Sequence, residues 1–419
     1  MSTITEHLTR VLDLITPGQP VNLPLSDALG CVLAQDCHAA LAVPPFSNSA
    51  MDGFLINVAD LDPAGTATLE VTGDVAAGAT ARIPEPGCAV RIMTGAPIPD
   101  DPVPEGLAVI PVEDTSALPG PQKLTPTITI NNYRGRAHIR PRGDNVAVGD
   151  RVARAGELVD ASMLAGLISA GVAEVSVHPR PTVTVLSSGD ELAPAGVIPG
   201  EGQIPDSNRP MVAALLGEAG IIHVTQEHTS DDPREFSEIF TRAVTESDLV
   251  ITTGGVSAGA FDVVKAVIGD TASGADMWFG PVQMQPGKPQ GAGTWARADG
   301  TSASVLCLPG NPVAAFVSFL LFIRPAVDKL RGITTVADLD SRPRVTAAAG
   351  VAFPDARTKD LIVPVRLAWG PEGATATPFT RQGRGSHFVA SLNGVDGFVI
   401  LAPDTPGPGP GAPLQVYLT

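Results

Sequence analysis

The stretch Leu249-Val250-Ile251-Thr252-Thr253-Gly254-Gly255-Val256-Ser257-Ala258-Gly259-Ala260-Phe261-Asp262 decides the fold. It opens as a short apolar run typical of a buried parallel strand, passes through a glycine-rich turn, and reaches Asp262 where a helical pattern begins. Glycines let a ligand approach the backbone closely, and the amides at the start of a helix attract anions. The stretch therefore predicts a phosphate-binding turn or, equally well on its own, an ordinary tight turn between strand and helix.

The same strand-then-helix pattern recurs on both sides of this stretch. Strands are expected at 182–186, 221–225, 249–253 and 304–308, and helices at 211–220, 233–245, 261–268 and 312–330. This alternation predicts an α/β fold with a doubly wound, mostly parallel sheet. Ligands bind such sheets beyond the carboxyl ends of the strands, so the loops that follow the strands form the candidate site.

Three acidic residues lie in those loops: Glu191, Asp231 and Asp262. Each one alone is more consistent with a helix cap, and Ser230 or Asp231 is expected to cap the helix that starts at Pro233. Several carboxylates beside anion-binding turns suggest instead a divalent cation that bridges an anionic ligand. Oxygen ligands of this kind suit Mg²⁺.

Composition limits the classes of partner. A net charge of −17 disfavours nucleic acid and anionic membranes, because the long-range field would repel them. The four cysteines form no CxxC pair and the seven histidines have no metal-ligand spacing, so free thiols in a reducing cytoplasm are expected and a zinc site is not. The most apolar helix, at 312–324, is too short to cross a bilayer, and no signal peptide is visible. The protein is therefore expected to be soluble and cytoplasmic.

The flanking regions have different patterns. Residues 2–15 predict an amphipathic helix. Short strands punctuated by glycine and proline fill 54–139 and predict a small β insertion, in which Thr94 lies at a turn and is expected to satisfy that turn with its own hydroxyl. Strand-like runs from 342 to 419 predict a second β domain of the barrel type.

Several segments, in this order along the chain, resemble the molybdopterin molybdenumtransferase family of the MoeA type, which is similar to the E domain of gephyrin. They are Ser49-Ala50-Met51-Asp52-Gly53, Arg91-Ile92-Met93-Thr94-Gly95-Ala96-Pro97, Gly189-Asp190-Glu191-Leu192, Asp206-Ser207-Asn208, Gly254-Gly255-Val256-Ser257-Ala258-Gly259, Pro286-Gly287-Lys288-Pro289, Leu308-Pro309-Gly310-Asn311-Pro312-Val313 and Gly385-Ser386-His387. They span nearly the whole chain, so the resemblance is specific.

The resemblance implies an elongated multidomain fold of α/β and β parts. Its domains are a discontinuous N-terminal linker domain (1–45 and 140–180), an inserted β domain (46–139), a doubly wound molybdopterin-binding α/β domain (181–331) and a C-terminal β-barrel (332–419). The family works as a homodimer. The resemblance implies a molybdopterin adenylyltransferase and molybdoenzyme chaperones as further partners.

The resemblance also implies an activity: molybdate is inserted into adenylylated molybdopterin, and AMP is released with the help of Mg²⁺. The implied catalytic residues are Asp52, Thr94, Glu191, Asp231, Asp262 and Lys288, with Mg²⁺ held by Glu191, Asp231 and Asp262. The implied molybdopterin-binding residues are Gly254, Gly255, Ser257, Gly259, Asn208, Pro309, Gly310, Asn311, Pro312 and Ser386.

The chain departs from the family pattern mainly where molybdate is expected to bind. Pro281 and Gln285 stand where some members carry lysines, Ala314 replaces a serine, and Val363 replaces an arginine expected in the barrel, with Arg366 nearby. Ser47 also stands where an aspartate is common. Two alternatives follow: a molybdopterin adenylyltransferase, because those enzymes share the α/β domain, and a non-catalytic molybdopterin-binding scaffold or carrier.

Overall fold

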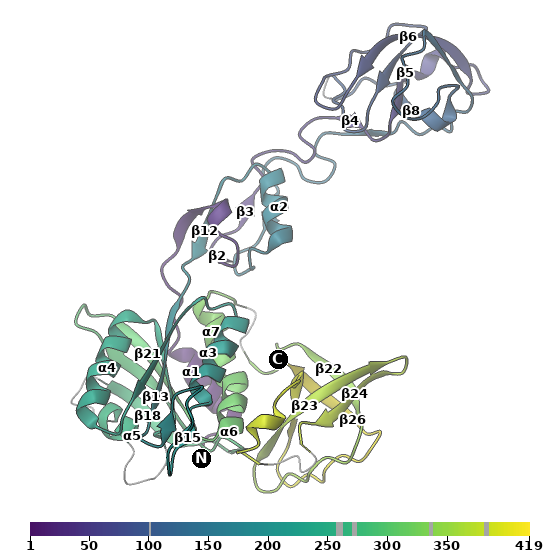
Figure 1. The fold of residues 1–419 in the computed structure, drawn as a ribbon. Coiled ribbons are helices and arrows are strands. Elements are labelled where there is room, and N and C mark those ends of the chain that lie inside the picture. The colour runs from purple at the N-terminus through teal and green to yellow at the C-terminus, as the bar shows by residue number, and fades with distance from the viewer. Residues whose placement is uncertain (100–101, 257–262, 270–274, 335–337, 381–384) are drawn as a thin grey trace. The chain divides into compact units, whose positions relative to one another are not determined.

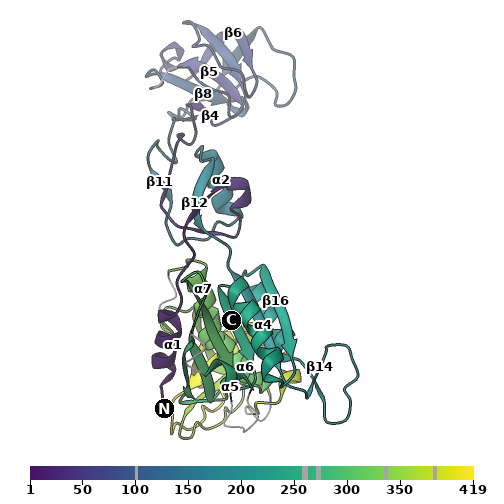
Figure 2. The same ribbon diagram turned by 90° about the vertical axis from the view of Figure 1, so that its left-hand side faces the viewer.

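The structure is a computed structural model that describes residues 1–99, 102–256, 263–269, 275–334, 338–380 and 385–419. The chain forms two compact units, drawn from two sides in Figures 1 and 2. The first unit contains Met1–Val21, Gly30–Ala34 and His178–Thr419, and the second contains Asn22–Leu29 and Gln35–Val177. The four domain boundaries expected from the sequence stay predictions.

The first unit is built on a six-stranded sheet. Its strands are, in spatial order, β16 (His223–Thr229), β13 (Thr182–Ser188), β17 (Leu249–Thr253), β21 (Ser302–Leu308), β20 (Pro289–Ala296) and β18 (Ala275–Pro281). The first four strands run parallel, and the last two pair antiparallel. The predicted doubly wound, mostly parallel sheet is therefore confirmed.

Helices cover both faces of this sheet (Figure 1). One face carries α1 (Ile4–Asp13), α3 (Asn208–Glu218) and the run α6 (Pro312–Ser318), η5 (Phe319–Ile323, a π-helix) and α7 (Arg324–Leu330); the other carries α4 (Pro233–Glu246) and α5 (Val263–Ile268). Because successive strand residues point to opposite faces, Leu249 and Ile251 join the first apolar cluster while Val250 joins the second. This double burial explains why β17 is apolar throughout.

Strands β18 and β20 were not expected from the sequence. Glycine has a low strand propensity, so the glycines of these segments argue against strands. The pairing of β18 with β20 nevertheless requires glycine at these positions. A Cβ atom on Gly291 would lie 2.6 Å from the Phe279 ring, and one on Gly293 would lie 2.1 Å from the Asp276 carbonyl oxygen. Glycine is present because neighbouring atoms of the cross-strand partner occupy the space of a side chain.

The C-terminal part of the first unit is a closed β-barrel, as predicted. Its ring is formed by β23 (Asp360–Gly370), β24 (Gly373–Pro378), β22 (Arg344–Ala349), β26 (Pro413–Leu418) and β25 (Gly397–Leu401), which pairs back with β23. Strand β24 and the short helix η6 (Val389–Ser391) were not predicted. The two-residue strand β19 (Met284–Gln285) pairs with the start of β23 and so joins the α/β part to the barrel.

The second unit contains the predicted β insertion. Its five-stranded sheet has the order β8 (Leu107–Pro111), β5 (Gly53–Asn57), β7 (Cys88–Ile92), β6 (Ala67–Val75) and β9 (Thr127–Ile130), with an apolar cluster on each face.

The remaining short elements of the chain are β1 (Val21–Pro24), η1 (Leu25–Asp27), β2 (Val32–Leu33), β3 (Cys37–His38), β4 (Asn48–Ser49), η2 (Val58–Asp60), η3 (Val112–Asp114), β10 (Ile139–Arg140), β11 (Arg151–Ala153), α2 (Ala161–Ser169), β12 (Glu174–His178), β14 (Leu192–Ala193) and β15 (Ile204–Pro205).

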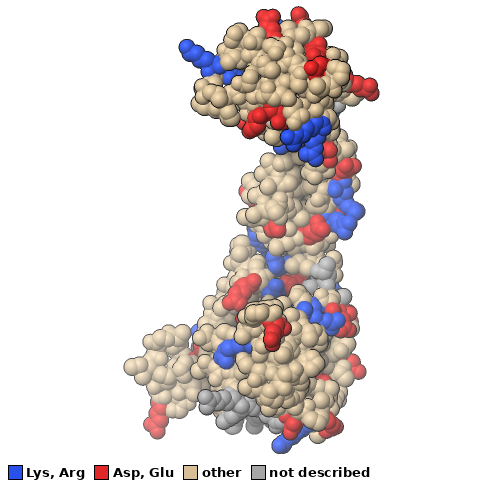
Figure 3. All heavy atoms as spheres, turned by 90° about the vertical axis from the view of Figure 1, so that its right-hand side faces the viewer, with Lys and Arg blue, Asp and Glu red and all other residues tan. Residues whose placement is uncertain are grey.

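Charged side chains are sparse on one face of the molecule. On the face that Figure 3 shows, acidic and basic side chains are scattered among a majority of uncharged atoms. Among the described residues, no helix is both long enough and apolar enough to span a lipid bilayer.

The packing of α4 onto the sheet gives a stability prediction. Phe240 is fully buried, stacks on Phe236 with ring centroids 5.7 Å apart, and meets Trp295 of β20 edge to face at 4.9 Å. Phe240→Ala should lower the free energy of unfolding by about 3–5 kcal/mol, because it removes apolar contacts and leaves a cavity. Chemical denaturation measures this change. Glu238→Ala, an exposed change on the same helix, is the control, and equal midpoints for the two variants would contradict the packing described.

Candidate functional site

The carboxyl ends of the parallel strands border a cavity of about 730 Å³ in the first unit. The walls come from the loops after β13, β17 and β21, from the segment around β19, and from the near edge of the barrel. Residues of the predicted site that line this cavity are Glu191, Gly254, Gly255, Lys288, Pro309, Gly310, Asn311 and Ser386. Residues far apart in the sequence thus meet at one opening.

The turns after β17 and β21 touch backbone to backbone. Gly254 and Gly255 have φ angles of +85° and +67°, a region that side chains disfavour. The Gly254 amide donates a hydrogen bond to the Leu308 carbonyl oxygen at 3.1 Å, and a Cβ atom on Gly310 would lie 3.5 Å from the Gly254 Cα. The floor of the cavity is therefore bare main chain. Ser257 and Gly259, also predicted in this turn, lie outside the described residues.

Asn208 is not one of the residues that line the cavity, but it holds one of the cavity's turns. Its Nδ2 donates to the Gly310 carbonyl oxygen at 2.7 Å, which fixes the turn after β21. The buried Asp206 carboxylate holds the start of α3, since it accepts bonds from the Ser187 hydroxyl at 2.7 Å and the Arg209 amide at 3.2 Å. The Asn208 Oδ1 is buried and has no hydrogen-bond partner among the described residues. The geometry gives Asn208 a positioning role.

Helix α6 begins beside the barrel. Pro312 lies in its first turn and Asn311 precedes it, but the Asn311 side chain makes no capping bond. The Val313 amide donates instead to the Ser386 carbonyl oxygen at 3.0 Å. The barrel loop that carries Ser386 is thereby tied to the α/β part at the cavity.

The loops after β13 and β16 are held together through their acidic residues. The Asp190 amide donates to Asp231 Oδ2 at 3.3 Å, and the Asp231 amide donates to Asp190 Oδ1 at 3.4 Å. The expectation that Ser230 or Asp231 caps α4 is wrong. Asp232 immediately precedes the first helical residue, and its side chain accepts the bonds from the Arg234 and Glu235 amides. The Asp231 carboxylate is therefore not used as a cap.

The predicted metal ligands are only partly placed by the structure. Glu191 lines the cavity, Asp231 lies in the neighbouring loop, and Asp262 falls outside the described residues. Within the described ranges, no group of three or more His, Cys, Asp or Glu side chains is arranged to hold a metal ion. The oxygen-only donor chemistry of Glu191 and Asp231 suits Mg²⁺.

Several lining residues were not predicted as site residues. They are Ser188, Ile204, Val256, Leu361, Ile362, Phe379 and His387. His387 stands next to Ser386 in the quoted Gly-Ser-His segment, so the sequence contained a signal for it. Phe379 follows the unpredicted strand β24, so nothing in the sequence pointed to it.

The departures from the family pattern have distinct places. Gln285 and Ala314 line the cavity, and Pro281 ends β18. Val363 is fully buried in the barrel core. The Arg366 guanidinium is occupied by three carbonyl oxygens, those of Asn393, Phe379 and Ser391. Arg366 therefore holds loops together and does not replace an anion-binding arginine.

Asp52 and Thr94, two predicted catalytic residues, belong to the second unit. The Thr94 amide and hydroxyl both donate to Asp52 Oδ1, at 2.7 and 2.8 Å. The expectation that the Thr94 hydroxyl satisfies its own turn is therefore wrong, because the Asp52 carboxylate is a stronger acceptor. These two bonds, the amide first, hold the pKa of Asp52 below its ordinary value.

Comparison with known proteins assigns this fold and cavity to a class. Residues 184–329 match the family model of a probable molybdopterin binding domain, and residues 2–171 match that of the MoeA N-terminal region, domains I and II. Molybdopterin molybdenumtransferase 2 of Mycobacterium tuberculosis is 39% identical over 344 residues, 80% of each chain. The molybdopterin molybdenumtransferase of Haemophilus influenzae is 35% identical over 336 residues, 79% of this chain and 78% of that protein.

The chain belongs to the molybdopterin molybdenumtransferase family. The crystal structure of the molybdopterin biosynthesis MoeA protein of Pyrococcus horikoshii has the same fold, with a TM-score of 0.78 over all of both chains and 24% identity. The family resemblance seen in the sequence segments is confirmed.

The bond between Thr94 and Asp52 predicts a pH effect. Thr94→Val keeps the backbone donor and removes the hydroxyl, so the pKa of Asp52 should rise towards its ordinary value of 3.8. Because the folded-state pKa is depressed, the stability from this bond is fully present above pH 3.8 and is lost as pH falls through the folded pKa. NMR titration of the Asp52 carboxyl carbon measures the change.

Thr115→Val is the matched control, because the Thr115 hydroxyl donates to the Val112 carbonyl oxygen and not to a carboxylate. An unchanged Asp52 titration in Thr94→Val would contradict the assigned bond.

Proposed function

We propose that this chain inserts molybdate into adenylylated molybdopterin and releases AMP. The observation that carries the proposal is the cavity, together with family membership. Its 730 Å³ lies within the range of about 300–1,000 Å³ typical of small-molecule sites, and it lies beyond the carboxyl ends of parallel strands. Its floor is main chain and its rim carries Lys288 and Ser386.

Each wall of the cavity suits a part of such a substrate. The bare turns at Gly254-Gly255 and Pro309-Gly310 let a phosphate come close to peptide groups. Lys288 attracts an oxyanion, and the Ser386 hydroxyl can donate a hydrogen bond to it. The apolar side chains of Leu361, Ile362 and Phe379 suit the faces of a planar ring.

We assign Mg²⁺ to Glu191, Asp231 and Asp262 as part of this proposal. A bound Mg²⁺ supplies positive charge for the pyrophosphate and for the AMP that leaves. The support is the all-oxygen donor set and the release of Asp231 from capping, since Asp232 performs that role. Glu191 and Asp231 come from the loops after adjacent parallel strands.

A homodimer and a cytoplasmic location belong to the same proposal. Leu41 and Ile168 are 52% and 61% exposed, and the Leu41 amide bonds to the Ala170 carbonyl oxygen at 2.8 Å, so both lie at the end of α2. This apolar patch suits a second copy of the chain. The four cysteines, all within the described residues, form no disulfide, which fits a reducing compartment. The adenylyltransferase and chaperone partners stay predictions.

A single charged substitution tests whether this apolar patch is the dimer contact. Ile168→Asp should shift sedimentation from dimer towards monomer, because it buries an unpaired carboxylate at the contact. Val148→Asp, also at an exposed apolar residue of the second unit, is the control. A dimer of unchanged stability in Ile168→Asp would show that this patch is not the contact.

The activity is tested by single-turnover AMP release from adenylylated molybdopterin with Mg²⁺. Release should require molybdate, and Glu191→Gln should slow it roughly tenfold or more. Glu201→Gln, at an exposed residue on the following loop, should change nothing. Binding without release would favour the carrier, and adenylylation of molybdopterin from ATP would favour the adenylyltransferase.

A further inference from the structure

The Glu191 side chain folds back over the turn that carries it. Gly189 directly follows β13, and Glu191, two residues later, lines the cavity. A Cβ atom on Gly189 would lie 2.2 Å from Glu191 Oε2, 2.7 Å from its Cδ and 2.9 Å from its Oε1. All three atoms belong to the carboxylate. This group therefore occupies the space that a side chain at residue 189 would need.

Hydrogen bonds fix the turn on which the carboxylate lies. The Gly189 amide donates to the Thr229 carbonyl oxygen at 3.2 Å, and the Leu192 amide donates to the Gly189 carbonyl oxygen at 3.2 Å. Gly189 has a φ angle of +138°, which residues with a side chain disfavour. Glycine at this position thus serves both the path of the backbone and the place of the carboxylate.

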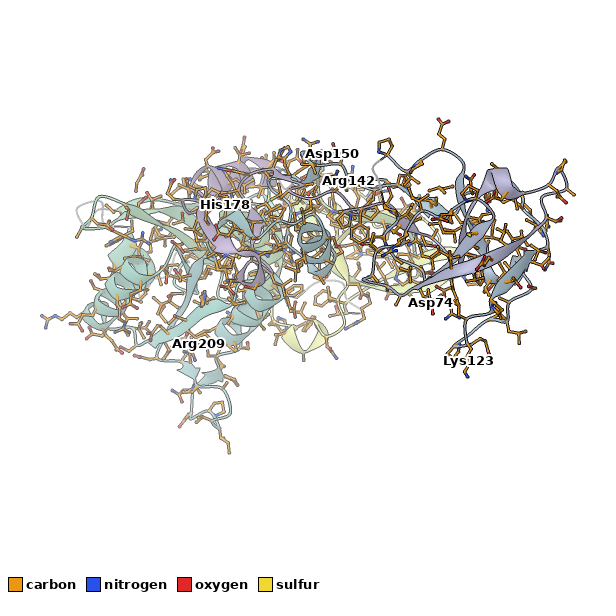
Figure 4. The ribbon with its side chains drawn as sticks, turned by 90° about the horizontal axis from the view of Figure 1, so that it is seen from above. Asp74, Lys123, Arg142, Asp150, His178 and Arg209 are labelled. Atoms are coloured by element: carbon orange, nitrogen blue, oxygen red, sulfur yellow. The ribbon has the colours of Figure 1, made fainter. Side chains whose placement is uncertain are left out.

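The loop between β14 and β15 holds the main chain of Glu191. This loop projects from the α/β part in Figure 2 and returns at β15, where the Ile204 amide donates to the Glu191 carbonyl oxygen at 2.7 Å. Asp206 follows β15 and forms an ion pair with Arg209, which Figure 4 labels, with 3.1 Å between Oδ2 and Nε. The backbone at Glu191 is therefore anchored to the start of α3.

The Glu191 carboxylate is held in place and still has free acceptor capacity. No hydrogen bond or ion pair between described residues involves it. A Cβ atom on Gly254 would lie 3.9 Å from the Ser188 carbonyl oxygen, so the turns after β13 and β17 adjoin. The carboxylate and the peptide groups proposed to bind phosphate thus belong to neighbouring turns.

We propose that Gly189 is a positioning residue: it sets the place of the Glu191 carboxylate and thereby the affinity of the site for a divalent cation. This inference rests on the cation assigned to Glu191 in the proposed function. A methyl group at residue 189 would come closer to the carboxylate than non-bonded atoms approach. The carboxylate would turn away, because it is the flexible end of its side chain. Residues that orient metal ligands contribute roughly 10- to 100-fold to metal affinity.

Titration of the full chain with MnCl₂ tests the role, with free Mn²⁺ measured by electron paramagnetic resonance. Mn²⁺ accepts the oxygen ligands that suit Mg²⁺. Gly189→Ala should weaken Mn²⁺ binding roughly tenfold or more. In the Glu191→Ala background the same change should weaken the remaining binding less than about twofold, because no carboxylate is present for the methyl group to displace.

Gly196→Ala is the matched control. Gly196 lies in the loop between β14 and β15 with a φ angle of +84°, and a Cβ atom there would meet nothing within 4 Å. The substitution adds a methyl group at positive φ without a collision, so Mn²⁺ affinity should stay unchanged. Thermal unfolding of each variant measures the backbone strain separately from cation binding.

A crystal structure of the Gly189→Ala variant tests the geometry without any metal. The Glu191 carboxylate should leave the position over residue 189, while the bond from the Ile204 amide to the Glu191 carbonyl oxygen should stay. A carboxylate that keeps its position beside the added methyl group would overturn the positioning role.

The outcomes separate this inference from the proposed function. Mn²⁺ affinity that is unchanged in Glu191→Ala would overturn the cation assignment, and the crystal structure would then decide the role of Gly189. Affinity that needs Glu191 but is unchanged in Gly189→Ala would overturn the positioning role alone. An equal loss from Gly189→Ala with and without the Glu191 side chain would also overturn it, because Gly189 would then act on the fold and not on the carboxylate.

Discussion

The structure of the site depends on the contact between two backbone turns. The Gly254 amide bonds to the Leu308 carbonyl oxygen, and the Gly310 main chain passes beside Gly254. Gly254 has a φ of +85°, a region that residues with a side chain disfavour. Asn208 and the loop at Ser386 then fasten to the same turns, one from α3 and one from the barrel. The strand ends, the helix and the barrel are thus fixed with respect to one cavity.

Anion binding by an acidic protein requires local donors. The net charge of −17 gives no long-range attraction for phosphate or molybdate. The cavity compensates with peptide groups at its floor and with Lys288 among its lining side chains. Val363 is buried and Arg366 is bonded to carbonyl oxygens, so neither position provides a guanidinium group to the cavity.

The sequence was sufficient for the parts of the fold that local patterns specify. Strand β17 and the continuous helical run that starts at Pro312 follow from apolar runs, proline and glycine. Strands β18 and β20 could not be predicted from local patterns, because Gly291 and Gly293 are explained only by their cross-strand neighbours. Strand β24 was not predicted either. The turn residues of the site could be predicted from their motif, whereas Phe379 reaches it through barrel pairing that local sequence does not encode.

The central claim is that the turns of the α/β part and the edge of the barrel form one ligand site. Hydrogen exchange with mass spectrometry, with and without saturating adenylylated molybdopterin, tests it most directly. The account predicts protection on binding in the segments 254–256, 286–289, 309–311 and 385–387 together. Protection confined to the second unit, with these four segments unchanged, would contradict it.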